Sequence, residues 1–135
     1  MPEKRTVEKA KEDLRRGKSP STAAGEFVRE EIKHVRQGKH GARSPKQAIA
    51  IGLSEARRAG VPLKPPREGQ TDESTRRSAE RDYETGQGRR RRRAPSKKRS
   101  AATKQALRRE PKNTASKRAL SKQAKRAAAQ RRRSR

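Results

Sequence analysis

Residues 44–60 read SPKQAIAIGLSEARRAG, and this stretch contains a complete set of local signals for one helix. The pair Ser44-Pro45 is typical of an N-cap followed by the first helical position, and Gln47 completes a capping box with the serine. Apolar residues then recur at helical spacing, two arginines suit the C-terminal turn, and the final glycine is typical of a helix end. The pattern predicts a helix over about residues 45–59.

Two further helices are expected on the N-terminal side of this stretch. A helix over about residues 20–37 begins at a second Ser-Pro pair and has an apolar stripe that includes Phe27. A shorter helix over about residues 6–16 ends at a glycine. The short segment 38–43 has a length that suits an antiparallel helical hairpin or a helix-turn-helix. We therefore expect an all-α fold, with a small helical hairpin and satellite helices in residues 1–65.

Charge is distributed unevenly along the 135 residues. Residues 1–88 contain 20 Lys and Arg against 14 Asp and Glu, whereas residues 89–135 contain 21 Lys and Arg and one acid, Glu110. Residues 66–88 are polar and predict a linker with one weak helix. Low hydrophobicity with high net charge is typical of intrinsic disorder, so we expect residues 89–135 to be a long disordered polycationic tail.

The composition of this tail favours a helix in one respect and opposes it in another. Ala, Lys, Arg and Gln are good helix formers, but crowded like charges oppose helix formation in free solution. We therefore predict a tail that is disordered when free and partly helical on a polyanion. The few large apolar residues in 1–65 make that part marginal alone, so dimerisation, as a homodimer, is an expected route to stability.

A basic terminal arm predicts non-specific, electrostatic binding of nucleic acid, in the manner of a histone-like or nucleoid-associated protein. Its expected contacts are the tail cations Arg89, Arg90, Arg91, Arg92, Arg93, Lys97, Lys98, Arg99, Lys104, Arg108, Arg109, Lys117, Arg118, Lys122, Lys125, Arg126, Arg131, Arg132 and Arg133. Secondary contacts are expected from the hairpin side chains Lys39, Arg43, Lys46, Arg57 and Arg58. The tail has no Phe, Tyr or Trp on which bases of a single strand could stack.

Several alternatives remain open at this level. DNA is the expected partner ahead of RNA, but a ribosome-associated or RNA-chaperone protein would use the same phosphate contacts. The helical hairpin could instead dock a protein partner, which would make the chain an interaction adaptor. A solvated solubility arm, or a nuclear-import signal, is the remaining interpretation of the tail.

An enzyme is not expected, and neither is a cofactor or a metal. The triplet Gly17-Lys18-Ser19 has the end of a phosphate-binding loop but lacks the earlier glycine and a preceding strand. Glu31 and His34 have the spacing of a metal-bundle motif, but such sites need a second pair, and an exposed helix face explains them. His40, between glycines, is expected to be a loop residue. The chain has no Cys, no apolar run long enough to span a membrane, and no secretory signal at its start.

Two segments resemble a known protein family. They are Gly38–Arg57, which contains KQAIAIGLSEAR, and Gly25–Ile32, which reads GEFVREEI. Together these resemble a group of small basic bacterial proteins that carry a domain of unknown function, over about residues 4–85. The resemblance implies a bacterial cytoplasmic source but no activity. Together with the expected DNA binding, this source predicts a location at the nucleoid. By composition alone, the tail is similar to the Ala/Lys/Arg tails of histone H1.

Overall fold

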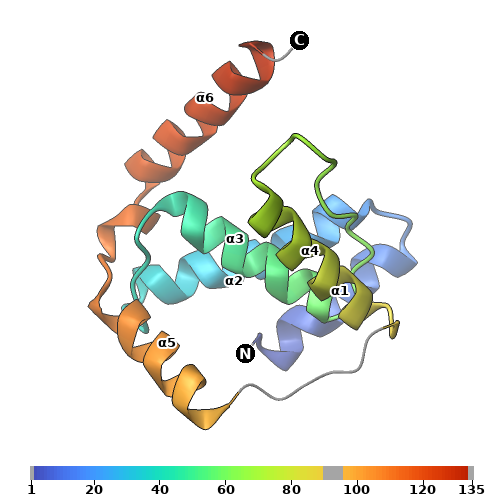
Figure 1. The fold of residues 1–135 in the computed structure, drawn as a ribbon, viewed down its shortest axis with the longest axis horizontal. Coiled ribbons are helices and arrows are strands. Elements are labelled where there is room, and N and C mark those ends of the chain that lie inside the picture. Colours follow the sequence, from blue (N-terminus) through green and yellow to red (C-terminus); the bar gives the residue numbers. More distant parts are fainter. Residues whose placement is uncertain (1, 90–95, 134–135) are drawn as a thin grey trace. The chain divides into compact units, whose positions relative to one another are not determined.

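The computed structural model describes residues 2–89 and 96–133, and every regular element in these ranges is helical (Figure 1). The elements, in chain order, are α1 (Lys4–Arg15), α2 (Pro20–Arg36), α3 (Pro45–Arg58), α4 (Glu73–Gly86), α5 (Lys97–Arg109), the 3-10 turn η1 (Asn113–Ala115) and α6 (Lys117–Arg133). The expected all-α class is therefore confirmed. The first three helices begin and end close to the positions that the Ser-Pro and glycine signals indicate.

Local hydrogen bonds explain those boundaries. The Ser19 hydroxyl accepts from the Thr22 amide at the start of α2, and the Ser44 hydroxyl accepts from the Gln47 amide at the start of α3. The Gln47 side chain accepts in return from the Arg43 amide, one residue before the N-cap that a capping box normally uses. At the end of α2, Gly38 has a φ of 77°, a conformation that costs a side-chain-bearing residue energy.

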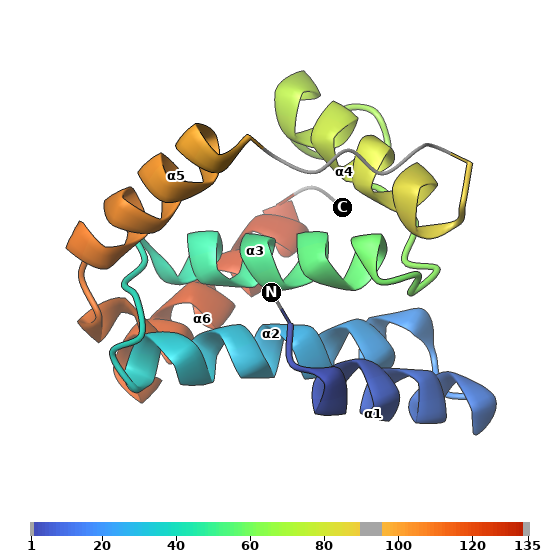
Figure 2. The same ribbon diagram turned by 90° about the horizontal axis from the view of Figure 1, so that it is seen from below.

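The chain forms two compact units, and each combines segments that are distant in sequence. Unit 1 consists of residues 1–30 and 50–94, and unit 2 consists of residues 31–49 and 95–135. Helices α2 and α3 run antiparallel and contribute one end to each unit (Figure 2). No helix in residues 2–89 and 96–133 is both long and apolar enough to cross a membrane.

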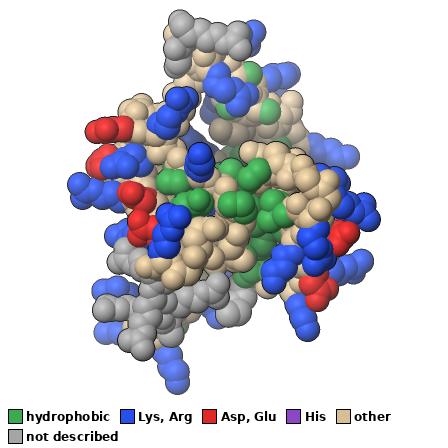
Figure 3. Space-filling model, turned by 90° about the vertical axis from the view of Figure 1, so that its right-hand side faces the viewer, with side chains coloured by type: hydrophobic (Ala, Val, Ile, Leu, Met, Phe, Trp, Pro, Cys, Tyr) green, Lys and Arg blue, Asp and Glu red, His purple; other side chains and the backbone are tan. Residues whose placement is uncertain are grey.

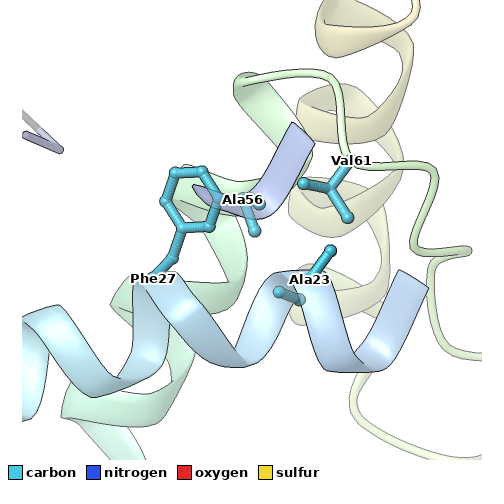
Figure 4. Close-up of a cluster of buried hydrophobic side chains, with 6 residues drawn as sticks. Ala23, Phe27, Ala56 and Val61 are labelled. Carbon is cyan, nitrogen blue, oxygen red and sulfur yellow. The ribbon is translucent and has the colours of Figure 1, made fainter. Parts of the chain in front are cut away.

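Unit 1 has a small apolar core between α1, α2 and α3. Phe27 is fully buried there with Ala23 and Ala56, and Val61 closes the cluster from the segment after α3 (Figure 4). Close packing of α2 on α3 depends on Gly52, because a Cβ there would overlap the backbone of Val28. Phe27 is thus a core residue and not a surface contact.

Helix α4 also belongs to unit 1. The Ser54 hydroxyl donates to Asp82 at 2.6 Å, and Arg58 lies 3.7 Å from the other oxygen of the same carboxylate. At the end of the helix, a Cβ on Gly86 would overlap the carbonyl oxygen of Arg57. The weak helix expected in the polar linker is therefore a formed helix that packs on α3.

In unit 2, the structure corrects the prediction of a disordered tail. Helices α5 and α6 cover most of the described tail, so disorder in the free chain is wrong for these residues. Each helix has a serine cap: Ser96 accepts from the Arg99 amide, and Ser116 accepts from the Ala119 amide. Since the helix-forming composition and the caps act together, they outweigh the like-charge repulsion on which the expectation of disorder rested.

Tertiary contacts also hold the tail within unit 2. Ala115 is 1% exposed and packs with Val35, Ala42 and Ala48. Arg36 Nε donates to the Ala115 carbonyl at 2.7 Å, so the end of α2 and η1 are joined through both apolar and polar contacts. Composition alone cannot show this, because the anchor is one alanine among many.

The connection between α2 and α3 supplies a second attachment for the tail. The Gly41 amide donates to the Leu107 carbonyl at 2.7 Å, and the Ala42 amide donates to the Pro111 carbonyl at 2.8 Å. A Cβ on Gly41 would overlap the carbonyl oxygen of Glu110, so only glycine permits this approach. The expected hairpin loop is therefore also the docking point of the C-terminal helices.

Candidate nucleic-acid interface

The basic side chains of α5 and α6 face solvent. All of the tail cations expected to bind nucleic acid are exposed where the structure describes them, namely Arg89, Lys97, Lys98, Arg99, Lys104, Arg108, Arg109, Lys117, Arg118, Lys122, Lys125, Arg126, Arg131, Arg132 and Arg133. Arg90, Arg91, Arg92 and Arg93 lie outside the described residues. Lys112, which was not among the expected contacts, is exposed as well.

These side chains have one acid near them in sequence, Glu110, which is the only acid after residue 88. Within residues 96–133 no Lys or Arg forms an ion pair with a carboxylate. The N–H donors of these ammonium and guanidinium groups are therefore not used by carboxylates. The described part of the tail is thus a source of uncompensated positive charge.

Helical periodicity collects much of this charge on one face of α6. The face consists of Arg118, Lys122, Lys125, Arg126, Arg132 and Arg133, which recur at intervals of three, four and seven residues. We call these six residues the α6 basic face. Leu120 and Ala127, on the opposite side of the helix, are half-buried. Six of the eight cations of α6 therefore share one face, and Lys117 and Arg131 lie outside it.

The length of α6 suits contact with a phosphate backbone. At about 1.5 Å per residue, the helix is roughly 25 Å long. Phosphates of one DNA strand follow one another every ~3.4 Å along the duplex axis. The α6 basic face is therefore long enough to meet several successive phosphates.

The polarity of α6 also favours its basic C-terminal end. Arg131, Arg132 and Arg133 occupy the last turn. Cations at this end interact favourably with the unpaired carbonyls and with the negative end of the helix dipole. The placement partly offsets the repulsion among the arginines, which helps to explain why so charged a segment is helical.

The expected secondary contacts differ among themselves in accessibility. Lys39, Arg43 and Lys46 are exposed, and all three belong to unit 2. Arg58 is exposed but lies 3.7 Å from Asp82 in unit 1. Arg57 does not face solvent, contrary to the prediction that it is a contact, because it is only 8% exposed.

The burial of Arg57 gives it a structural role. Its guanidinium group donates to the carbonyl of Leu63 at 3.1 Å and to that of Lys64 at 3.4 Å. Burial lowers the pKa of Arg57, while the nearby Asp82 carboxylate acts in the opposite direction. We therefore assign Arg57 to holding the segment after α3 against that helix, and leave it out of the interface.

The basic residues of unit 1 are arranged differently from those of the tail. Figure 3 shows acidic side chains lying among the basic ones on the face that it draws. In α1, Glu12 pairs with Arg15 and Arg16, and in α4, Glu73 pairs with Arg76 and Arg77. The arginines lower the pKa of both carboxyls, mainly through hydrogen bonds from Arg15 and Arg76.

One group of potential metal ligands was found only in part from the sequence: Glu31 and His34 were singled out by their spacing but assigned to an exposed helix face, whereas Glu31 is 3% exposed. Glu31, His34 and His40 each place a ligand atom within 4.8 Å of the other two. His40 was expected to be a separate loop residue, because nothing in the local pattern shows that the loop turns back toward α2. The Glu-x-x-His spacing of Glu31 and His34 was the signal for two of the three residues.

Of three comparisons with known proteins, one found a match, to a protein family. No curated protein and no solved structure matches the chain. Residues 3–68, just under half of the chain, match a family of unknown function (DUF6496). The match covers the KQAIAIGLSEAR segment on which the resemblance was based, but the bacterial source and the histone-like character of the tail stay predictions.

Proposed function

We propose that this protein binds nucleic acid through charge and without reading base sequence, with duplex DNA as its partner. The observation that supports the proposal is the state of the Lys and Arg side chains in α5 and α6, which are exposed and have no carboxylate partners among the described residues. In this proposal the α6 basic face supplies affinity, and the rest of unit 2 holds that face in place.

The mechanism is the displacement of counterions from the phosphate backbone. Each cation that meets a phosphate releases condensed salt ions, so the binding constant falls as salt rises, by a slope of about 0.9 per phosphate bound on duplex DNA. Ordered helices strengthen this mechanism, because a preformed face loses less conformational entropy on binding than a disordered tail would. Binding also relieves the repulsion among the six cations of the face.

The same mechanism implies a location. A charge-based DNA-binding protein of a bacterial cell would be cytoplasmic and concentrated at the nucleoid. RNA is the alternative partner, and phosphate contacts alone do not distinguish the two polymers. The experiment below therefore compares them directly.

The test is a salt titration of binding by the full-length protein. Fluorescent duplex DNA of two unrelated sequences, single-stranded DNA and duplex RNA serve as probes. We expect a steep slope of log K against log salt, and equal affinity for the two DNA duplexes. A strong preference between the duplexes would contradict charge-only binding, and tighter binding to duplex RNA would replace DNA by RNA as the partner.

Two variants with the same change in net charge locate the interface. The first replaces the α6 basic face by Gln at positions 118, 122, 125, 126, 132 and 133. The second replaces six ion-paired cations of unit 1 by Gln, namely Lys9, Arg15, Arg16, Arg29, Arg76 and Arg77. Gln is a good helix former, and circular dichroism checks that both variants remain helical.

The two variants are expected to differ in the salt slope of binding. Replacing the α6 basic face should reduce the salt slope by about 0.9 for each phosphate that is no longer bound, or by about 5 if all six cations bind. The unit 1 variant should keep a slope close to that of the unchanged protein. Equal reductions in both variants would mean that total charge, and not its placement, determines binding.

A further inference from the structure

Unit 2 brings together three side chains that are typical metal ligands. Glu31 and His34 lie three residues apart near the end of α2, so they point from the same face of the helix. His40 comes from the connection to α3. Glu31 is 3% exposed, and the two imidazoles are half-buried.

Both ring nitrogens of His40 lie within hydrogen-bond distance of an oxygen atom. Its Nδ1 lies 2.8 Å from the carbonyl oxygen of Gly41, and its Nε2 lies 2.5 Å from Oε1 of Glu31. The carbonyl oxygen of Gly41 only accepts, so Nδ1 has the N–H that donates to it. The contact at Nε2 therefore holds either one proton, shared between the ring and the Glu31 carboxyl group, or a metal ion in place of that proton.

The surroundings favour the metal over the proton. A histidine that binds a metal usually donates its other N–H to a carbonyl or carboxylate, which fixes the tautomer and presents the free nitrogen. The bond from His40 Nδ1 to Gly41 has this form. The His34 ring approaches edge-on, with ring centroids 6.4 Å apart and planes inclined by 76°. A proton explains only the contact between Glu31 and His40, whereas a metal uses the ligand atoms of all three residues.

We propose that Glu31, His34 and His40 form a binding site for a divalent transition-metal ion, with Zn²⁺ as the ion that this ligand set fits best. Two imidazole nitrogens and one carboxylate oxygen are a known zinc set, and the fourth tetrahedral position goes to water. Zinc–ligand distances of about 2.0–2.1 Å place ligand atoms about 3.3 Å apart. Binding would move the His40 Nε2 and Glu31 Oε1 atoms apart from their present 2.5 Å, whereas any ligand atoms farther apart than this, within the 4.8 Å limit, would move closer.

A metal here would stabilise the attachment of the C-terminal helices. It would link the last turns of α2 to the loop residue His40. The residues directly after His40 donate backbone hydrogen bonds to Leu107, near the end of α5, and to Pro111, just after it. The site therefore holds the loop to which the tail is attached. It is independent of the proposed nucleic-acid binding, and either proposal can fail without the other.

The first test uses the unaltered full-length protein. The chain has only two histidines and no Cys, so every imidazole signal in a nitrogen-15 NMR spectrum belongs to His34 or His40, and thiolate binding is excluded. After treatment with a chelator, Zn²⁺ alone is titrated in without nucleic acid. We expect one nitrogen of each ring to shift, with both changes complete at one Zn²⁺ per chain. Unchanged rings, or a change in one ring only, would overturn the site and leave the shared proton between His40 and Glu31.

The second test follows visible absorption of Co²⁺, which substitutes for Zn²⁺, in single variants. Glu31→Gln keeps the size of the side chain and a hydrogen-bond acceptor, while His34→Ala and His40→Ala remove the nitrogen ligands. Each should weaken Co²⁺ binding at least as much as removing an outer-sphere partner does, by roughly 10- to 100-fold or more. The control is Glu26→Gln, which removes a carboxylate from the same helix but outside the cluster.

The two tests remain decisive if one variant fails to fold. Glu31→Gln is the least disruptive change, and binding equal to that of Glu26→Gln would overturn the carboxylate's role. A loss of Co²⁺ binding in a variant whose helix content is unchanged supports the site. The NMR titration needs no variant, so a folding defect cannot obscure its result.

Discussion

Four helices are rich in Lys and Arg: α1 and α4 in unit 1, and α5 and α6 in unit 2. The two pairs differ in whether these cations are paired with carboxylates. In α1 and α4 the arginines lie three or four residues from glutamates and pair with them. In α5 and α6 no described Lys or Arg pairs with a carboxylate, and these cations are exposed. The difference teaches that a net charge of +26 says little until the partners of each cation are known.

The two units also differ in how they are held together. Unit 1 has the only Phe of the chain in its core, and the described core of unit 2 is built from Val35 and three alanines. Unit 2 compensates with polar contacts from the α2–α3 loop to the tail. Because Tyr83 lies in unit 1 and both histidines lie in unit 2, tyrosine and imidazole signals report on the two units separately.

The largest effect is expected from Phe27→Ala. Removing a fully buried aromatic side chain leaves a cavity and should lower the free energy of unfolding by about 3–5 kcal/mol. Urea unfolding followed by Tyr83 fluorescence measures the change. Since the tail cations are untouched, any remaining folded protein should keep the salt slope of DNA binding. A stability loss below about 1 kcal/mol would mean that Phe27 is not the centre of the unit 1 core.

A smaller effect is expected from Gly41→Val, which acts on unit 2. The new side chain overlaps the backbone of Glu110, so the loop or the tail must move, at a typical cost of about 1–3 kcal/mol. Amide hydrogen exchange should show faster exchange at position 41, at Ala42 and in η1. The matched control is Gly25→Val, because a Cβ at Gly25 meets nothing within 4 Å. Equal exchange in both variants would break the assignment of Gly41 as the docking point.

The serine caps of the tail are expected to contribute less. Replacing Ser96 or Ser116 by Ala removes one side-chain hydrogen bond to the first turn of α5 or α6. Each change should cost about 1 kcal/mol of helix stability, measured by thermal melting with far-ultraviolet circular dichroism. Ser121→Ala, inside α6, is the control and should have little effect. If the caps and the control behave alike, packing and composition alone stabilise the tail helices.

The smallest effect on stability is expected when the pH is lowered. The pKa values of Glu12 and Glu73 are lowered in the folded protein by hydrogen bonds from arginines. Their contribution to stability is therefore complete above the unfolded pKa, near 4.5, and is lost as pH falls through the lowered folded value. Carboxyl NMR titration between about pH 5 and pH 2, below the titration range of histidine, measures it. Both carboxylates are exposed, so only a slight weakening of α1 and α4 is expected.

The control for this prediction is in the tail. Helix α6 contains no carboxylate, whereas Glu110 follows α5 directly, so the α6 amide signals should not follow the titration of Glu12 or Glu73. If the α6 amides report the same acid transition, the stability of α6 depends on these carboxylates in a way that the ion pairs do not reveal.

Local sequence signals located some parts of the structure well and misplaced others. Helices α2 and α3 were placed closely, because Ser19, Ser44 and the glycines after each helix act through bonds within a few residues. The exposed tail cations could also be named in advance, since charged side chains without partners remain in water. Arg57 was misplaced as an exposed contact, because its burial depends on Leu63 and Lys64 folding back over α3.

What the sequence determined by itself is therefore the local part of this protein: where its helices begin and end, and which half of the chain has unbalanced positive charge. Tertiary structure alone decided that the tail is docked, that Ala115 anchors it, and that His40 returns to Glu31 and His34. The physical reason is distance along the chain. Caps and charge pairs act over three or four residues, whereas the contact between Arg36 and Ala115 depends on how segments 79 residues apart pack together.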